Sequence, residues 1–274
     1  MIQKSINIGN FDVSNNLPFI LIAGPCSIEG NDHSIDHAGR INEICKSLNI
    51  NFVFKSSFDK ANRSSSQSLR GIGIDKGLKI LSNVKKKINV PIITDVHESS
   101  HCKEVASVVD IIQIPAFLCR QTDLLVAAGE TKKIVNIKKG QFLAPWDMAN
   151  VVKKIEETGN NNILLTERGT CFGYNTLVSD MRSIPQMTNF GYPIIFDATH
   201  SVQQPGGLGL TSGGQREFVP ILCRAAVAIG VAGLFIEVHE NPDMAPSDGP
   251  NMIKLSELKN LLSKLLEIDR VIKV

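Results

Sequence analysis

Short runs of apolar and β-branched residues, each bounded by polar residues, recur along the chain and predict eight buried strands. These runs are nearly continuous and do not alternate strictly, which is typical of strands covered on both faces of a parallel sheet. They span residues 19–24, 51–56, 91–96, 111–116, 133–138, 162–168, 193–199 and 233–238.

Between these runs, apolar residues fall at the three- and four-residue spacing of amphipathic helices. The clearest helical segments are residues 35–48, 75–87, 149–157, 217–229 and 255–268. Regular alternation of strand and helix predicts an α/β fold with a parallel sheet, and eight units favour a closed (β/α)8, or TIM, barrel. An open doubly wound sheet is the alternative, which is weakened because no Gly-x-Gly-x-x-Gly follows the first strand.

The first residues depart from this rhythm. Apolar and polar positions alternate around Gly9-Asn10, a two-residue turn signal, and predict a hairpin within residues 1–17 that caps one end of the barrel.

The length of 274 residues favours a single catalytic domain over residues 1–274. Three long polar segments, residues 56–73, 201–216 and 238–254, all follow strands, so we expect them on the face that carries the chemistry in barrel enzymes.

Composition and charge exclude several classes of function. With a formal net charge of +2 and 5% aromatic residues, the chain lacks a basic, aromatic-rich surface, so we expect no nucleic-acid partner. It contains neither the apolar core of a signal peptide nor a membrane-spanning segment of about 20 apolar residues, and we expect a cytoplasmic protein with no membrane partner. The six cysteines form no Cys-x-x-Cys pair, which favours reduced thiols.

The carboxyl ends of the predicted strands are unusually polar. Lys55, Lys138 and Arg168 each close an apolar run, where a lone cation would be costly unless an anionic ligand lies nearby. Any one of them is ordinarily a solvated surface charge, but their shared position favours a positively charged pocket for phosphate esters. The full set of strand-end and adjoining loop positions is Cys26, Lys55, Lys60, Arg63, Asp95, His97, Gln113, Lys138, Arg168, His200, Glu237 and Asp248.

A second pattern points to a metal. Cys26, His200, Glu237 and Asp248 follow the first, seventh and eighth strands, which are neighbours in a closed barrel. One thiolate, one imidazole and two carboxylates are ordinary ligands for Zn²⁺, Fe²⁺ or Mn²⁺. The alternative is a free cysteine in a turn beside a hydrogen-bonded histidine. His97, His101 and His239 are assigned no role.

Nearly the whole chain resembles the 3-deoxy-manno-octulosonate 8-phosphate synthases, also called 2-dehydro-3-deoxyphosphooctonate aldolases. The related 3-deoxy-arabino-heptulosonate 7-phosphate synthases typically carry Lys-Pro-Arg-Thr where this chain has Lys60-Ala61-Asn62-Arg63. The segments that carry the resemblance are AGPCSIE (23–29), FKSSFDKANRSS (54–65), TDVHE (94–98), IQIPAFLCRQTDLL (112–125), NIKKGQFLAPWDM (136–148), ERGTCFGYNTLVSDMRS (167–183), DATHSVQQPGG (197–207) and FIEVHENPDMAPSDGPN (235–251).

The resemblance implies a transferase that condenses phosphoenolpyruvate with arabinose 5-phosphate and water for lipopolysaccharide biosynthesis. It also implies a homotetramer and a glycine-rich lid after His200. Phosphoenolpyruvate would contact Lys55, Lys60, Gln113, Ala116, Lys138 and Arg168; Asn62, Arg63 and Ser64 would bind the sugar phosphate; Ser57 and Phe117 complete the substrate-binding residues. The catalytic candidates are Lys60, Asn62, Asp95 and His200.

The family includes metal-dependent members with cysteine at the position of Cys26 and metal-independent members with asparagine there. The resemblance therefore implies a divalent ion held by Cys26, His200, Glu237 and Asp248. Two other functions stay open: a heptulosonate phosphate synthase that accepts erythrose 4-phosphate, and a non-catalytic barrel that binds phosphorylated metabolites.

Overall fold

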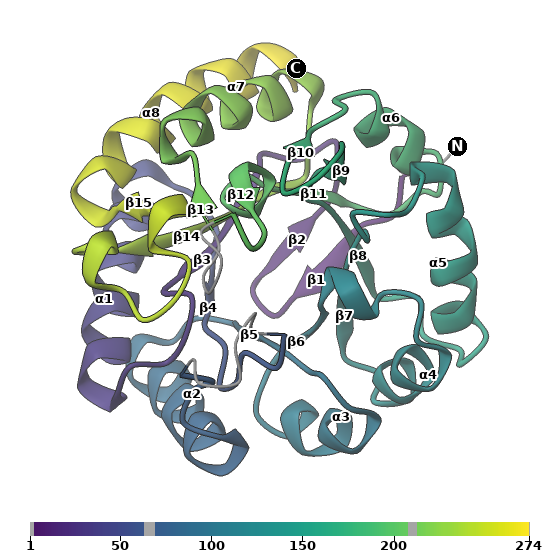
Figure 1. Ribbon diagram of the computed structural model, residues 1–274, viewed down its shortest axis with the longest axis horizontal. Coiled ribbons are helices and arrows are strands. Elements are labelled where there is room, and N and C mark those ends of the chain that lie inside the picture. The colour runs from purple at the N-terminus through teal and green to yellow at the C-terminus, as the bar shows by residue number, and fades with distance from the viewer. Residues whose placement is uncertain (1–2, 63–68, 208–212, 274) are drawn as a thin grey trace.

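Eight parallel strands close into a barrel, with helices on its outside (Figure 1). The computed structural model describes residues 3–62, 69–207 and 213–273. Each barrel strand pairs with its neighbours in chain order, and β14 pairs with both β11 and β3, which closes the ring. The predicted TIM barrel is confirmed. Its strands are β3 (Ile20–Gly24), β4 (Phe52–Lys55), β5 (Ile92–Asp95), β6 (Ile111–Ile114), β7 (Ile134–Lys138), β8 (Ile163–Glu167), β11 (Ile194–Asp197) and β14 (Gly233–His239).

The outer layer consists of helices that connect successive strands. The five helical segments recognised in the sequence all form helices, and three shorter ones join them. The helices are α1 (Asn31–Leu48), α2 (Ile74–Ile88), α3 (Ser99–Ala106), α4 (Thr122–Glu130), α5 (Met148–Glu156), α6 (Ser183–Thr188), α7 (Val219–Ile229) and α8 (Leu255–Ile272).

Burial on both faces explains why the strands are continuous apolar runs. Every residue of the eight barrel strands is buried. Outward-facing side chains pack beneath the helices, whereas inward-facing ones, such as Ile22, Ile93 and Phe235, form a separate cluster inside the barrel. At the ends of α1 and α2, Asn49 and Asn89 adopt the left-handed conformation that ends a helix, so the chain enters the next strand within a few residues.

The predicted N-terminal hairpin is present as β1 (Ile6–Ile8) and β2 (Phe11–Val13), paired antiparallel. Its residues Ile6, Ile8 and Val13 are buried in the same apolar cluster as the inward-facing residues of the barrel. In Figure 1 the hairpin lies across the middle of the ring of strands. These contacts place it over the N-terminal ends of the strands, away from the long loops.

No described helix is long and apolar enough to span a membrane.

The long connections follow the carboxyl ends of the strands and contain short elements of their own. The short strands are β9 (Thr170–Cys171), β10 (Leu177–Val178), β12 (Gln203–Gln204), β13 (Gly213–Gly214) and β15 (Ile253–Lys254). The 3₁₀ turns are η1 (Ala116–Leu118), η2 (Pro145–Asp147), η3 (His200–Val202), η4 (Arg216–Phe218), η5 (Pro242–Met244) and η6 (Gly249–Asn251).

Candidate active site

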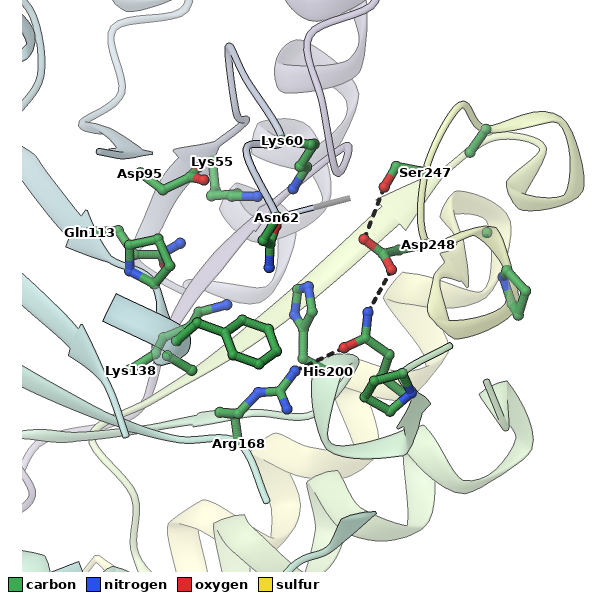
Figure 2. Close-up of a pocket in the computed structure, with 18 of the residues that line it drawn as sticks. Lys55, Lys60, Asn62, Asp95, Gln113, Lys138, Arg168, His200, Ser247 and Asp248 are labelled. Carbon is green, nitrogen blue, oxygen red and sulfur yellow. Dashed lines mark hydrogen bonds between the residues drawn. The ribbon is translucent and has the colours of Figure 1, made fainter. Parts of the chain in front are cut away.

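A cavity of about 470 Å³ opens at the carboxyl ends of the barrel strands. Residues from most of the strands and from the loops beyond them point into it (Figure 2). The structure thus brings together side chains as far apart in the sequence as Lys55 and Asp248, which are 193 positions apart. The residues singled out from the sequence that line the cavity are Lys55, Lys60, Asn62, Asp95, His97, Gln113, Ala116, Phe117, Lys138, Arg168, His200 and Asp248.

Two lysines at the base of the cavity are already paired with buried carboxylates. Lys138 donates to Asp197 at 2.6 Å, and Lys55 donates to Glu237 at 3.1 Å. Lys55 also donates to Ser57 and to the Cys26 carbonyl. The expectation that these cations would be without partners in the protein is therefore wrong, because acids from distant strands compensate them. The pocket holds a balanced set of charges and not a uniformly positive surface.

Arg168 differs from the two lysines because part of its guanidinium finds no partner. Its Nη2 donates to Gln203 at 3.0 Å, but the buried Nη1 makes no hydrogen bond with the described residues. Burial lowers the pKa of Arg168, against the opposing charge of Asp197. A buried cationic donor of this kind favours an anionic ligand, because a planar guanidinium matches phosphate or carboxylate oxygens.

Asp95 links the ends of β4 and β5. It accepts a hydrogen bond from Ser57 and lies 3.1 Å from Nε2 of His97. Burial alone would raise the pKa of Asp95, but the His97 hydrogen bond and the charges of Lys55 and Lys60 hold it well below its usual value. Asp95 is therefore a carboxylate at neutral pH, and it accepts the hydrogen bond of Ser57. Ser57, predicted to bind substrate, is buried and does not line the cavity.

Of the four predicted metal ligands, His200 and Asp248 line the cavity, whereas Cys26 and Glu237 are buried next to them. Oxygen and sulfur atoms of Cys26, Glu237 and Asp248 lie within 4.8 Å of one another. His200 Nε2 is 3.6 Å from Glu237 Oε1, and its Nδ1 is 2.8 Å from Asp197. The buried Glu237 Oε2 has no hydrogen-bond partner among the described residues. An unpartnered carboxylate oxygen beside a thiol, an imidazole and a second carboxylate fits a transition-metal ion.

The electrostatics of this group depend on burial and close packing. Burial, followed by the charge of Glu237, raises the pKa of the Cys26 thiol far above its ordinary value. Burial would raise the pKa of Glu237 as well, but His200 and Lys55 hold it below its usual range. In this state the thiol donates to Asp248 at 3.1 Å. A thiol in these surroundings needs a cation beside it to become a thiolate.

A glycine allows β3 and β4 to place their last residues side by side. A Cβ on Gly24 would lie 2.0 Å from the carbonyl oxygen of Lys55, so no other residue fits without a backbone shift. This close approach brings the turn that carries Cys26 next to the Lys55 side chain. The geometry of the site thus depends on a residue that has no chemistry of its own.

Some candidates lie outside the described residues, and two contributors were missed. Arg63 and Ser64 fall in residues 63–68, and the centre of the predicted lid falls in residues 208–212, none of which the structure describes. Asp197 was overlooked because the predicted strand extended to residue 199, whereas β11 ends at Asp197. Gln203, which joins Arg168 to Asp248, gave no signal because it is an uncharged residue in a loop.

Comparison with known proteins assigns the family. The model of the DAHP synthetase I family matches residues 3–274. The chain belongs to this family. Within it, proteins named 2-dehydro-3-deoxyphosphooctonate aldolase from Brucella anthropi and Brucella ovis are each 60% identical over 271 residues, or 99% of this chain and 98% of theirs. The Bartonella henselae protein of the same name is 60% identical over 268 residues, or 98% of this chain and 96% of its own. The resemblance drawn from the sequence is confirmed.

Proposed function

We propose that this DAHP synthetase I family member is a 3-deoxy-D-manno-octulosonate 8-phosphate synthase. It condenses phosphoenolpyruvate with D-arabinose 5-phosphate and water, and it releases inorganic phosphate. The observation that carries the proposal is the match to relatives named for the octulosonate enzyme over almost their entire length. The same match favours this reaction over the heptulosonate alternative and over a barrel without catalytic activity.

Phosphoenolpyruvate, with its phosphate and carboxylate, would bind deepest in the cavity. Arg168 offers the free Nη1 donor there, and Lys138 lies at the barrel floor beside it. Gln113 lines the same region, and Asn136 fixes its orientation by donating to its side-chain oxygen at 3.3 Å. Holding several negative charges against their mutual repulsion is a large part of catalysis in this reaction.

Arabinose 5-phosphate would bind nearer the rim, above phosphoenolpyruvate. Asn62 lines the cavity on the loop after β4, and Phe117 lines it on η1 with about half of its surface exposed. We propose that Asn62, together with Arg63 and Ser64, binds the sugar phosphate and hydroxyls. Phe117 forms an apolar wall that separates the reacting carbon atoms from bulk water.

We propose that Cys26, His200, Glu237 and Asp248 hold a divalent transition-metal ion. When bound, such an ion supplies Lewis acidity toward a carbonyl or water oxygen. Lys60 Nζ lies 4.0 Å from Glu237 Oε1, and we propose that it holds or delivers a proton at the sugar aldehyde oxygen. Asp197 orients the imidazole of His200, which we propose as the second group that handles protons.

The substrate assignment is tested by comparing acceptors. Purified protein is incubated with phosphoenolpyruvate and either arabinose 5-phosphate or erythrose 4-phosphate, and phosphate release is measured. We expect kcat/KM to be at least a hundredfold higher with arabinose 5-phosphate. A preference for erythrose 4-phosphate would establish the heptulosonate alternative, and binding of phosphoenolpyruvate by calorimetry without turnover would establish a non-catalytic barrel.

The metal assignment is tested by chelation and elemental analysis. We expect EDTA treatment to abolish activity and Zn²⁺, Fe²⁺ or Mn²⁺ to restore it. In Cys26→Asn, retained metal should fall at least tenfold, because the thiolate ligand is lost. Full activity after exhaustive chelation, with no metal by elemental analysis, would refute the assignment.

We further propose that the protein is a cytoplasmic homotetramer, as the resemblance implies. Several large apolar side chains are exposed around the loops at the carboxyl face, a pattern that favours contact between copies. They are Phe172, Tyr174, Val178, Phe218 and Ile221. Light scattering coupled to gel filtration should give four times the chain mass of 29.9 kDa, and a monomer would contradict this assembly.

A further inference from the structure

A second cluster of titratable side chains lies where helix α1 passes the end of β14. His33 and His37 are one helical turn apart on α1, and their rings stack with centroids 5.5 Å apart. His239 and Glu240 come from the end of β14, and Glu29 precedes α1. None of these five residues lines the cavity described above. The cluster therefore needs an explanation of its own.

The contacts of His37 fix the position of its proton. His37 is buried. Its Nε2 lies 2.9 Å from the carbonyl oxygen of Val238, which can only accept a hydrogen bond, so Nε2 carries a proton. The buried Nδ1 makes no hydrogen bond with the described residues, and it is the nitrogen that a neutral ring of this tautomer offers to a metal ion.

The atom that faces this nitrogen is a carboxylate oxygen. Glu240 Oε2 lies 3.2 Å from His37 Nδ1. A carboxylate oxygen at this distance from an imidazole nitrogen, with no hydrogen bond between them, is spaced so that both atoms can bind one cation.

The other atoms of the cluster complete a ligand set. His33 Nε2 lies 3.0 Å from Glu240 Oε1, and atoms of His33, His37 and Glu240 lie within 4.8 Å of one another. Ligand atoms around tetrahedral Zn²⁺ lie roughly 3.3 Å apart, given metal–ligand bonds of about 2.0 Å. His239 is satisfied separately, because its Nδ1 accepts the Asn241 backbone N–H and its Nε2 lies 3.0 Å from Glu29.

We propose that His33, His37 and Glu240 form a second divalent-metal site, distinct from the catalytic centre, that joins helix α1 to the segment following β14. Two imidazoles and one carboxylate select a borderline ion such as Zn²⁺ over Mg²⁺ or Ca²⁺. Because the side chains of His33 and Glu240 are partly exposed, at 23% and 40%, an ion can enter from solvent. Glu240 begins the loop that carries Asp248, so the ion fixes the start of an active-site loop.

Cobalt substitution distinguishes this site from the catalytic one. A cysteine thiolate bound to Co²⁺ gives an intense near-ultraviolet charge-transfer band, whereas a ligand set of histidine and glutamate does not. Chelator-treated full-length protein is titrated with Co²⁺, and bound metal is counted by elemental analysis after gel filtration. We expect each chain to bind one Co²⁺ ion that gives no thiolate band, whether or not Cys26 binds another Co²⁺ ion.

Two substitutions test the ligand set. In His33→Gln and Glu240→Gln, we expect the affinity for the Co²⁺ ion that gives no thiolate band to fall at least tenfold, while the thiolate band itself is unchanged. Both side chains are partly exposed, so folding should persist, and circular dichroism checks this. His101→Gln, a partly buried histidine on α3 outside the cluster, is the matched control and should retain both equivalents.

The outcomes separate this proposal from the catalytic assignment. If the wild-type protein binds no ion beyond the one reported by the thiolate band, the second site does not exist. If that second ion persists with unchanged affinity in both variants, other residues hold it and the proposal is wrong. Absence of the thiolate band alone would count against the Cys26 site and leave the histidine site standing.

Discussion

Replacing Lys138 with methionine tests whether the buried lysine serves both stability and catalysis. Lys138 donates to Asp197 at 2.6 Å, and both side chains are almost fully buried. Burial would raise the pKa of Asp197, but His200 and Lys138 hold it far below its usual value, and His200 still faces the acid when the lysine is removed. An uncompensated buried charge costs about 3–5 kcal/mol.

The structure places the expected loss at the lower end of that range. His200 Nδ1 remains 2.8 Å from Asp197, and the Thr199 hydroxyl and the His200 backbone N–H donate to its other oxygen. We therefore expect Lys138→Met to lower the free energy of unfolding by about 3 kcal/mol. Lys138 lines the cavity and is proposed to bind phosphoenolpyruvate, so its loss should lower kcat/KM at least a hundredfold, or about 2.7 kcal/mol of transition-state stabilisation.

A double variant separates the two effects. In Lys138→Met with Asp197→Asn the buried charge is gone, so urea unfolding followed by circular dichroism should recover about 2 kcal/mol of the lost stability. Phosphate release should stay low. Lys153→Met removes an exposed lysine and should change stability by less than about 0.5 kcal/mol. If Lys138→Met keeps wild-type activity, or the second substitution recovers activity together with stability, the assigned role of Lys138 is wrong.

Three further predictions concern burial and close contacts. Burial raises the pKa of Cys45 from 9.0 to about 12. The neutral thiol therefore contributes its full stabilisation below pH 9, and the free energy of unfolding falls by about 1.4 kcal/mol per pH unit between pH 9 and 12. Urea unfolding at pH 8 and pH 10 should show a smaller decrease in stability in Cys45→Val than in the wild type, and equal decreases would contradict this. Gly24→Ala should destabilise by about 1–3 kcal/mol, because the new methyl group meets the Lys55 carbonyl; an unchanged Tm would show that β3 shifts freely. Arg168→Ala should weaken the binding of phosphoenolpyruvate in calorimetry and lower kcat/KM on the order of a hundredfold, whereas Gln203→Ala, which leaves the guanidinium in place, should lower it less; equal losses would place the binding function elsewhere.

The fold was predictable because burial on both faces leaves a clear pattern in the sequence. Each barrel strand is buried throughout and mostly apolar, even where its last residue is charged. The shorter helices were less clear: α6 has six residues and contains Pro185, and α4 is apolar around most of its circumference. Neither gives the amphipathic period over several turns that distinguishes α2 or α8.

Most of the predicted residues line the cavity, but how they pair with one another was not predictable. A strand end identifies a residue at the mouth without identifying its neighbours. Lys55 pairs with Glu237 across 182 positions, and Lys138 pairs with Asp197 across 59. Such pairs depend on which strands the closed barrel makes adjacent and on side-chain length. For the same reason the histidine cluster at α1 gave no signal, because Glu240 contacts His37 only through tertiary packing.

The hairpin of β1 and β2 has a consequence for the order of events in the reaction. Ile6, Ile8 and Val13 fill one end of the barrel with packed hydrocarbon, and the cavity lined by the described residues opens at the other end. If phosphoenolpyruvate binds at Arg168 and arabinose 5-phosphate binds nearer the rim, as proposed, phosphoenolpyruvate must enter first. Release is ordered in the same way, because a molecule at the rim must leave before one that is bound behind it.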